Sequence, residues 1–230
     1  MDLRPQLTRL RALPADFARL KHYDWRRHGL SLSLIVVGVL LLAYVISQYF
    51  GMFSEQRRLA QQWEQENARA AAAASNGQKA STSFVDDGLT RLSIPKIDLD
   101  AVVVEGASRK QLAVAPGHLK DTATPGENGN AVITAHRDTF FRHIYELNKG
   151  DNIVIRRRGE VYKFEVTGRK IVDPQDVTVL RKSKDARLTL ITCYPTYYIG
   201  PAPERLVVFS KLVERSSQEA ASNQLTSNSP

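Results

Sequence analysis

Three residues of this sequence, Cys193, His136 and Arg205, could together carry out acyl transfer. A cysteine thiolate is a strong nucleophile, and a nearby cation favours that form. A histidine can take up the thiol proton and later protonate a leaving amine. An arginine stays charged at any working pH and can hydrogen-bond the oxygen that becomes negative in a tetrahedral intermediate. This set of residue types therefore supports chemistry through a thioester.

The spacing of the three residues places them at strand ends. Cys193 is the only cysteine of the chain and closes the apolar run TLITC, whereas Arg205 opens the next run after a proline-rich loop. If the two runs pair as antiparallel strands, the loop neighbours face each other across about 4.8 Å. His136 ends a third run, in AVITAHRD. We therefore expect Cys193 and Arg205 at the mouth of one hairpin, with His136 as the third candidate.

The residues alone also allow a purely structural interpretation. A lone cysteine on an apolar strand is most often a small buried hydrophobe. His118 and His143 show that this chain contains histidines without an evident chemical role. The spacing therefore leaves open an enzyme or a membrane-tethered binding module.

Residues 29–50 form an uncharged stretch of 22 residues. As a helix it would be about 33 Å long, against about 30 Å of membrane hydrocarbon. It is longer than the apolar region of a signal peptide and begins later, so we expect an uncleaved anchor. Seven Lys and Arg precede it, whereas two follow closely. This bias predicts a single-pass protein of the cytoplasmic (inner) membrane, with a cytoplasmic N-terminus and an extracytoplasmic catalytic domain.

The rest of the chain divides by composition. We expect a cytoplasmic tail over 1–28, a juxtamembrane stalk and linker over 51–88, a compact domain over 89–214 and a disordered tail over 215–230. Within the stalk, residues 54–74 are rich in helix formers, with Ser54 as a plausible cap, but lack a wide apolar face. The net charge of +8 fits an anionic surface. No nucleic-acid-binding motif occurs, so nucleic acid is not an expected partner.

The compact domain has the pattern of a β-barrel. Short apolar runs alternate with turn residues over 91–105, 130–137, 152–172, 187–193 and 205–213, whereas 112–119 could form one helical turn. Gly159–Glu160 between two alternating runs predicts a two-residue hairpin of type II′. Helical pattern is sparse between the runs, which argues against a parallel α/β sheet.

Several motifs resemble those of the sortases. TLITC, followed by a loop and then Glu204–Arg205, resembles the sortase signature around the nucleophile and arginine. NAVITAHRDTFFRHI resembles the segment around the catalytic histidine. IVDPQDVTVL and TCYPTYYIGPAPER are similar to the class D branch in particular. The resemblance covers residues 89–213, with the motifs in the family's order.

The resemblance implies a mostly β fold: a sortase-like closed β-barrel of about eight strands with short helices, preceded by one transmembrane helix and a stalk helix. It implies a membrane-anchored cysteine transpeptidase that cleaves an LPxT-like C-terminal sorting motif of secreted proteins. The acyl part would be held as a thioester on Cys193 and passed to an amine, either of a cell-wall precursor or of a protein. His136 would be the general acid–base, and Arg205 the oxyanion donor. Membrane lipid is the other expected partner.

Some points stay open within the resemblance. An enzyme of the same fold could mainly hydrolyse, and the residues that bind the substrate are not identified. Ala135 stands where many relatives carry glycine, which should be tolerated unless that backbone needs a positive φ. No acidic cluster precedes IVDPQDV, so calcium is not expected, nor is any other metal or cofactor.

Overall fold

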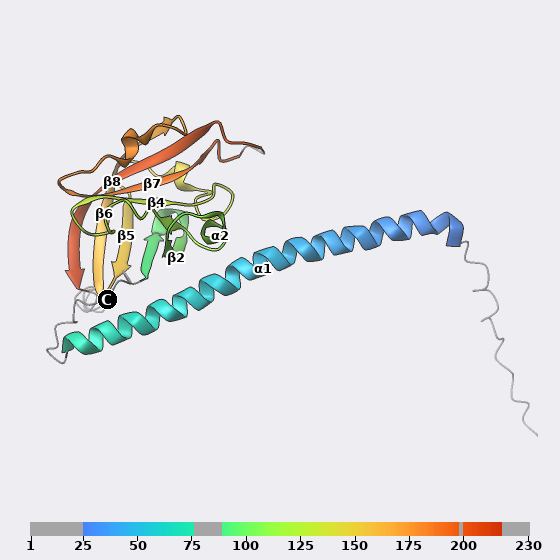
Figure 1. The fold of residues 1–230 in the computed structure, drawn as a ribbon, viewed down its shortest axis with the longest axis horizontal. Helices are drawn as coiled ribbons and strands as arrows, with labels where there is room; N and C mark the ends of the chain where they lie inside the picture. The colour runs from blue at the N-terminus through green and yellow to red at the C-terminus, as the bar shows by residue number, and fades with distance from the viewer. Residues whose placement is uncertain (1–24, 76–88, 198–199, 218–230) are drawn as a thin grey trace, which may run out of the picture. The chain divides into compact units, whose positions relative to one another are not determined.

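A computed structural model describes residues 25–75, 89–197 and 200–217 (Figure 1). The chain divides into two compact units between Ser47 and Gln48. The first unit contains the N-terminal part of a long helix, and the second contains the rest of that helix and all the strands.

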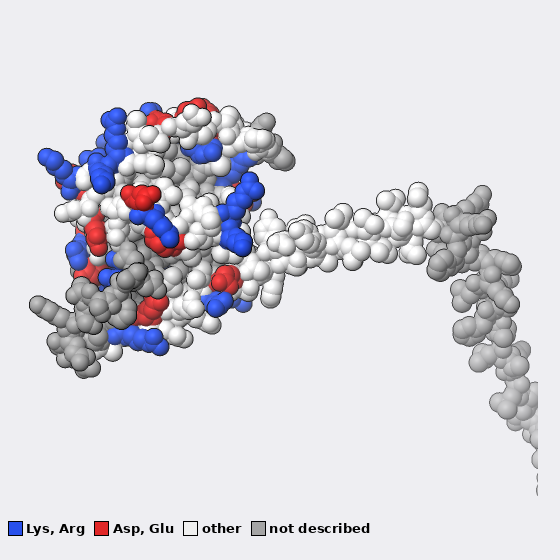
Figure 2. Space-filling view, in the orientation of Figure 1, with Lys and Arg blue, Asp and Glu red and all other residues white. Residues whose placement is uncertain are grey.

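The long helix α1 spans Trp25–Ser75. Among the described residues, its Gly29–Arg69 part is the one segment long and apolar enough to cross a membrane. The hydroxyls of Ser33 and Ser47 donate to carbonyls one turn earlier, at 2.8 and 2.7 Å, so they are satisfied within the helix. Residues 29–54 of this part contain no Asp, Glu, Lys or Arg, and the helix in Figure 2 is correspondingly white over most of its length away from the barrel. These features support membrane anchoring, while the expected orientation stays a prediction.

The strands form one closed barrel in the order β1-β2-β3-β4-β7-β8-β6-β5 (Figure 1). All neighbours are antiparallel except the parallel pairs β2–β3 and β4–β7. The expected fold, a mostly β closed barrel of eight strands with short helices, is thus confirmed. The strands are β1 (Thr90–Ile94), β2 (Leu99–Glu105), β3 (Gly117–His118), β4 (Gly129–Thr134), β5 (Asn152–Arg157), β6 (Glu160–Val172), β7 (Ala186–Tyr194) and β8 (Glu204–Ser217).

Four short helical segments connect the strands. They are η2 (Pro95–Ile97), α2 (Arg109–Leu112), η3 (Ile144–Glu146) and η4 (Val177–Leu180). The helical turn expected within 112–119 lies instead over Arg109–Leu112, and Gly117 and His118 form β3. The reason is a capping box: the Ser108 hydroxyl accepts from Gln111 N, and the Gln111 side chain accepts from Ser108 N, which starts the turn there.

The β5–β6 hairpin differs from the expected type. Its two turn residues are Arg158 and Gly159, because β5 ends at Arg157 and β6 begins at Glu160. Both turn residues have positive φ, 52° and 76°. Positive φ at both central positions defines a type I′ turn, so the prediction of type II′ over Gly159–Glu160 is wrong.

The core of the barrel is filled partly by the connection between β4 and β5. Phe141, Ile144 and Leu147 from this connection are fully buried against strand residues such as Phe164 and Leu188. The segment that follows His136 is thereby held by apolar packing. A short η3 turn inside it keeps its backbone groups bonded locally.

Within the second unit, the C-terminal half of α1 packs on the barrel. The Gln56 amide accepts from Val102 N at 3.0 Å and donates to Val114 O at 2.8 Å. Trp63 is only 6% exposed, and the Arg91 guanidinium lies 5.1 Å from its ring centroid. The stretch expected to be a solvated stalk therefore contributes one side chain to the core. Ser54, expected as a cap, lies inside the continuous helix and bonds to Gly51 O.

Some expectations lie outside the described residues. These are the N-terminal tail before residue 25, the linker residues 76–88 and the C-terminal tail beyond residue 217. The expected disordered tail began at residue 215, but β8 continues through Ser217, where it pairs with Glu160 of β6. The division into a tail, anchor, stalk and catalytic domain otherwise stays a prediction.

Candidate active site

Three adjacent strands bring the expected residues together. Cys193 of β7 and Arg205 of β8 are direct cross-strand partners. On the other side of β7, the parallel strand β4 has Thr134 in register with Ile191. Two residues beyond this pair lie His136, just after the end of β4, and Cys193 of β7. The pairing continues past the end of β4, because Ala135 N donates to Ile191 O at 3.3 Å and Thr192 Oγ1 donates to Ala135 O at 2.8 Å.

The candidate site lies on the outer face of the barrel. Leu190 belongs to the core and Tyr194 packs against it. Because side chains alternate along a strand, Ile191 and Cys193 point to the other face. Arg205 shares that face as the direct partner of Cys193. The end of the barrel thus brings the Cys193 thiol next to Arg205 and next to the segment that carries His136.

The three groups are half-buried. Among the described residues, neither the Cys193 thiol nor the His136 ring has a hydrogen-bond partner. The Arg205 guanidinium donates to Glu204 O at 2.9 Å and to Ala202 O at 3.3 Å. Catalytic hydrogen bonds are often loose in the absence of substrate, so this geometry is compatible with the expected roles.

An apolar pocket of about 170 Å³ adjoins these residues. Its floor continues the outer face of the same three strands, and its wall is the connection between β6 and β7, which contains η4. Arg205 also lines it. The sequence analysis identified no pocket residues, although the apolar residues of IVDPQDVTVL were a usable signal for this wall. The apolar and small lining residues include Thr134, Val172, Val177, Val179, Leu180, Ile191 and Val207.

Asp176 shapes the wall of this pocket. Its Oδ1 accepts from the backbone N–H of Thr178 at 3.0 Å, which caps η4, and from the Thr178 hydroxyl at 2.5 Å. Both hydrogen bonds hold the pKa of Asp176 below its ordinary value, and the bond from the Thr178 hydroxyl has the larger effect. The ionised carboxylate therefore supports the fold of the wall.

Arg137, the residue after His136, reaches the connection between β7 and β8. Its guanidinium donates from Nη1 to Pro195 O at 2.9 Å and from Nη2 to Gly200 O at 2.5 Å. Pro195 lies two residues after Cys193, and Gly200 lies five residues before Arg205. The sequence interpretation missed this residue, because nothing in the sequence tells which carbonyls an arginine will contact.

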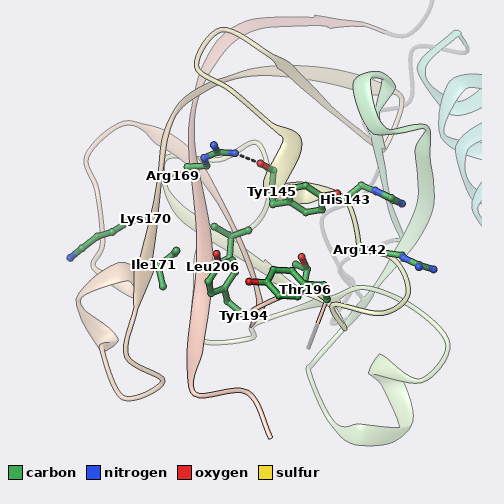
Figure 3. Close-up of a pocket in the computed structure, with 10 residues that line it drawn as sticks. Arg142, His143, Tyr145, Arg169, Lys170, Ile171, Tyr194, Thr196 and Leu206 are labelled. Carbon is green, nitrogen blue, oxygen red and sulfur yellow. Dashed lines mark hydrogen bonds between the residues drawn. The ribbon is translucent and has the colours of Figure 1, made fainter. Parts of the chain in front are cut away.

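A second cleft, of about 640 Å³, opens at the same end of the barrel (Figure 3). Tyr194, Leu206 and Ile171 line it, whereas Arg142 and Lys170 point outward at opposite sides. The residues Tyr145 and Glu146 beside it influence each other. A hydrogen bond to Glu146 raises the pKa of Tyr145, and the hydrogen bond with His143 lowers the pKa of Glu146.

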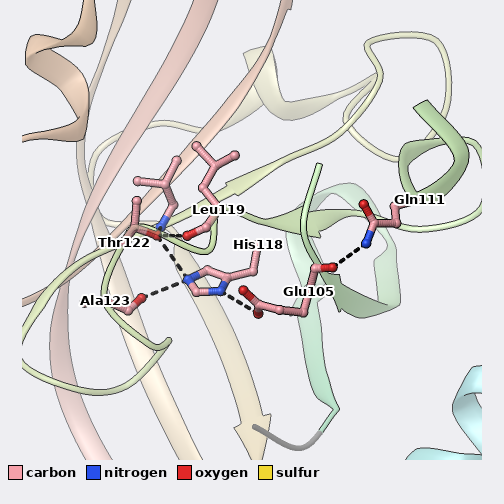
Figure 4. A network of polar contacts seen from close by, with 7 residues as sticks. Glu105, Gln111, His118, Leu119, Thr122 and Ala123 are labelled. Carbon is pink, nitrogen blue, oxygen red and sulfur yellow. Dashed lines mark hydrogen bonds and ion pairs between the residues drawn. The ribbon is translucent and has the colours of Figure 1, made fainter. Parts of the chain in front are cut away.

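The other two histidines of the barrel are engaged elsewhere. His118 is buried and bonds through Nδ1 to Glu105 Oε2 at 2.8 Å and through Nε2 to Ala123 O at 2.9 Å (Figure 4). Thr122 of the same network accepts from Val132 N of β4 at 3.2 Å. His143 bonds to Glu146 at 2.8 Å. The network of His118 thus supports the strand that leads to His136.

Ala135 is accommodated without backbone strain. It is 3% exposed and belongs to the core. Among the described residues, the positive-φ positions other than glycine are Asp98 and Arg158, so Ala135 does not need the conformation that favours glycine. In the part of the chain that the structure describes, no group of three or more His, Cys, Asp or Glu side chains is placed to hold a metal ion.

Comparison with known proteins identifies the family of this barrel. The family model of the sortase domain matches residues 92–213. Sortase D of Bacillus subtilis (strain 168) is 39% identical over 123 residues, which agrees with the expected class D branch. The match covers 53% of this chain and 62% of that relative, so this chain spans less than two thirds of the relative's length.

Solved structures show the same fold. A Sortase D5 transpeptidase of Clostridium perfringens superimposes with a TM-score of 0.58 at 24% identity, covering 70% of this chain and 99% of that one. Sortase E1 of Streptomyces coelicolor, solved with a tripeptide in the active site, gives a TM-score of 0.53 at 27% identity, covering 58% of this chain and 93% of that one.

Proposed function

Because this chain belongs to the sortase family, we propose that it is a membrane-anchored cysteine transpeptidase. It cleaves an LPxT-like sorting motif of secreted proteins and transfers the acyl part to an amine. One observation carries the proposal: Cys193 stands between Arg205 and the end of the His136 strand, on one face of three adjacent strands.

The first half of the reaction forms a thioester. His136 takes the proton of the Cys193 thiol, and the sulfur attacks the carbonyl carbon of the scissile peptide bond. Arg205 turns from its own loop carbonyls to the oxygen that becomes negative in the tetrahedral intermediate. The intermediate collapses as the C–N bond breaks, and His136 returns the proton to the leaving amine. The acyl part then remains on Cys193.

The second half transfers the acyl group. An acceptor amine attacks the thioester carbonyl, His136 takes a proton from its nitrogen, and the C–S bond breaks. The sulfur leaves as a thiolate, which recovers the proton from His136. With water in place of the amine, the same steps give hydrolysis, which is the competing outcome. The acceptor is an amine of a cell-wall precursor or of a protein.

The apolar pocket beside Arg205 is the proposed site for the sorting motif. Leucine and proline side chains match its apolar floor and wall. A related Sortase E1 holds a tripeptide in its active site, which supports recognition of a short peptide on this fold. The proposed site extends from η4 to Arg205, so a peptide lying in it would bring its scissile bond to Cys193.

The proposed location is the outer side of the cytoplasmic membrane. The apolar part of α1 anchors the chain, and the excess of Lys and Arg before residue 29 keeps the N-terminus in the cytoplasm. The barrel then meets secreted proteins after they cross the membrane.

Mass spectrometry of the trapped acyl-enzyme tests the proposal. The full chain in detergent is mixed with a library of LPxT-type peptides, and the mass of the protein is measured with and without triglycine or hydroxylamine. We expect an acyl adduct on Cys193 that is absent from Cys193→Ala and that disappears with formation of an amide product. A product that never incorporates the amine would identify a peptidase. The absence of any adduct, together with partner binding unaffected by alkylation, would identify a binding module.

A further inference from the structure

The residue that follows His136 ties together the two segments of the proposed active site. Arg137 bonds to the carbonyl oxygens of Pro195 and Gly200, at 2.9 and 2.5 Å. These carbonyls belong to the connection that begins after Cys193 and ends before Arg205. One guanidinium therefore links the segment that follows β4, next to His136, to the β7–β8 connection. This connection lies between Cys193 and Arg205 in the sequence.

The chemistry of the side chain suits this task. A guanidinium presents several N–H donors in a rigid, planar fork and stays charged, so its hydrogen bonds to carbonyls are charge-assisted. Lysine has one nitrogen on a flexible stem and cannot reproduce that fork. Both contacts also lie outside the regular pairing of β7 with β8, which ends at Tyr194 and Glu204.

The bonds of Arg137 act on a part of the site that the sheet leaves unsupported. β4 ends at Thr134, so the sheet does not fix His136 directly, although Ala135 is bonded on both sides. Beyond Ala135, the backbone is held by Phe141, whose N–H donates to His136 O at 3.1 Å. The guanidinium adds a link toward Cys193 that neither the sheet nor the core provides.

We propose that Arg137 is a positioning residue, which holds His136 at the working distance from Cys193 by anchoring the β7–β8 connection. This inference rests on the proposed function, because it assigns no chemical step to Arg137. A displacement of about 1 Å between reacting groups can cost about a hundredfold in rate. Loss of Arg137 is therefore expected to lower the rate of thioester formation by about tenfold to a hundredfold.

The test compares three variants of the full chain in detergent, with hydroxylamine as a small acceptor. Arg137→Ala removes both bonds, Arg137→Lys keeps the charge without the fork, and Arg109→Ala is a matched control on the exposed helix α2. We expect a lower kcat in both Arg137 variants, with the peptide KM changed less than about twofold. Millimolar guanidinium should restore part of the rate of Arg137→Ala, whereas ammonium at the same ionic strength should not.

The outcomes separate this inference from the proposed function. If the wild-type chain forms no adduct on Cys193, the proposed function fails. If it does, and Arg137→Lys is as fast as Arg109→Ala, the positioning role is wrong. Should Arg137→Ala fail to fold, Arg137→Lys still decides the question. A rise in peptide KM at constant kcat would also overturn the role, because it would indicate a binding contact.

Discussion

Cys193 and Arg205 stand directly opposite each other on β7 and β8, one residue pair before the regular pairing ends. Their proximity follows from a single hairpin, so it needs no long-range contact. His136 reaches the same place by the parallel pairing of β4 with β7, which joins residues more than fifty positions apart, such as Thr134 and Ile191. The site thus combines one local and one distant pairing.

Replacement of Arg205 tests the oxyanion role. We expect Arg205→Ala to lower kcat for thioester formation by about a hundredfold to a thousandfold, the usual effect of losing one such donor. Arg205→Lys should recover part of the rate, because it keeps a charged donor. The measurement is single-turnover formation of the acyl adduct. An Arg205→Ala enzyme with the wild-type rate would remove Arg205 from the mechanism.

The two pairings also explain what the sequence could predict. The hairpin of Cys193 and Arg205 follows from two apolar runs and a proline-rich loop, and the order of motifs resembles that of a known family. The parallel pairing of β4 could not be derived from the run alone, because side-chain alternation does not name a partner strand. The resemblance implied that His136 acts together with Cys193, but it did not specify the parallel pairing that brings them together.

Other features depend on tertiary contacts that no local pattern encodes. The contact of Gln56 with Val102 requires the helix to lie along the part of β2 that β3 does not pair with. Trp63 is buried, although the stretch around it is polar in sequence. A single large side chain adds little to an apolar face, so the sequence pattern did not indicate this contact. The turn at Arg158 was missed because arginine rarely has positive φ, and only the adjacent Gly159 signalled the hairpin.

Asp176 should make the apolar pocket beside Arg205 sensitive to acid. Because hydrogen bonds from Thr178 lower its pKa below the ordinary 3.8, the carboxylate stabilises the fold at pH values above the ordinary pKa. That contribution is lost as the pH falls through the lowered pKa. We expect Asp176→Ala to be less stable than wild type at pH 6, with the difference shrinking below about pH 4. Urea unfolding across this pH range measures it.

The same variant should also weaken peptide binding. Without the cap on η4, the wall of the apolar pocket loses a constraint, so the donor KM is expected to rise about twofold to fivefold at neutral pH. Asp185→Ala is a suitable control, since Asp185 is exposed and precedes β7 outside the pocket. An unchanged KM in Asp176→Ala would show that the wall does not bind the motif.

Ala135→Gly should cost stability without improving activity. The methyl group is buried and the backbone does not need positive φ, so glycine removes packing and adds unfolded-state entropy. The expected loss is about 1 kcal/mol of unfolding free energy. Ala101→Gly, at a buried position of β2 away from the site, provides the control. A faster Ala135→Gly enzyme would indicate that the extra methyl group constrains the neighbouring His136.

Removal of the helix contacts should destabilise the barrel itself. Gln56→Ala leaves the N–H of Val102 without its partner, at a cost of about 1–3 kcal/mol. Trp63→Ala empties a buried position and is expected to cost about 3 kcal/mol. Gln62→Ala, on the exposed side of α1, should have little effect. A barrel fragment that begins at residue 89 should likewise unfold at lower urea than one that begins at residue 48. Equal midpoints for the two fragments would show that the packed half of α1 contributes nothing to the stability of the barrel.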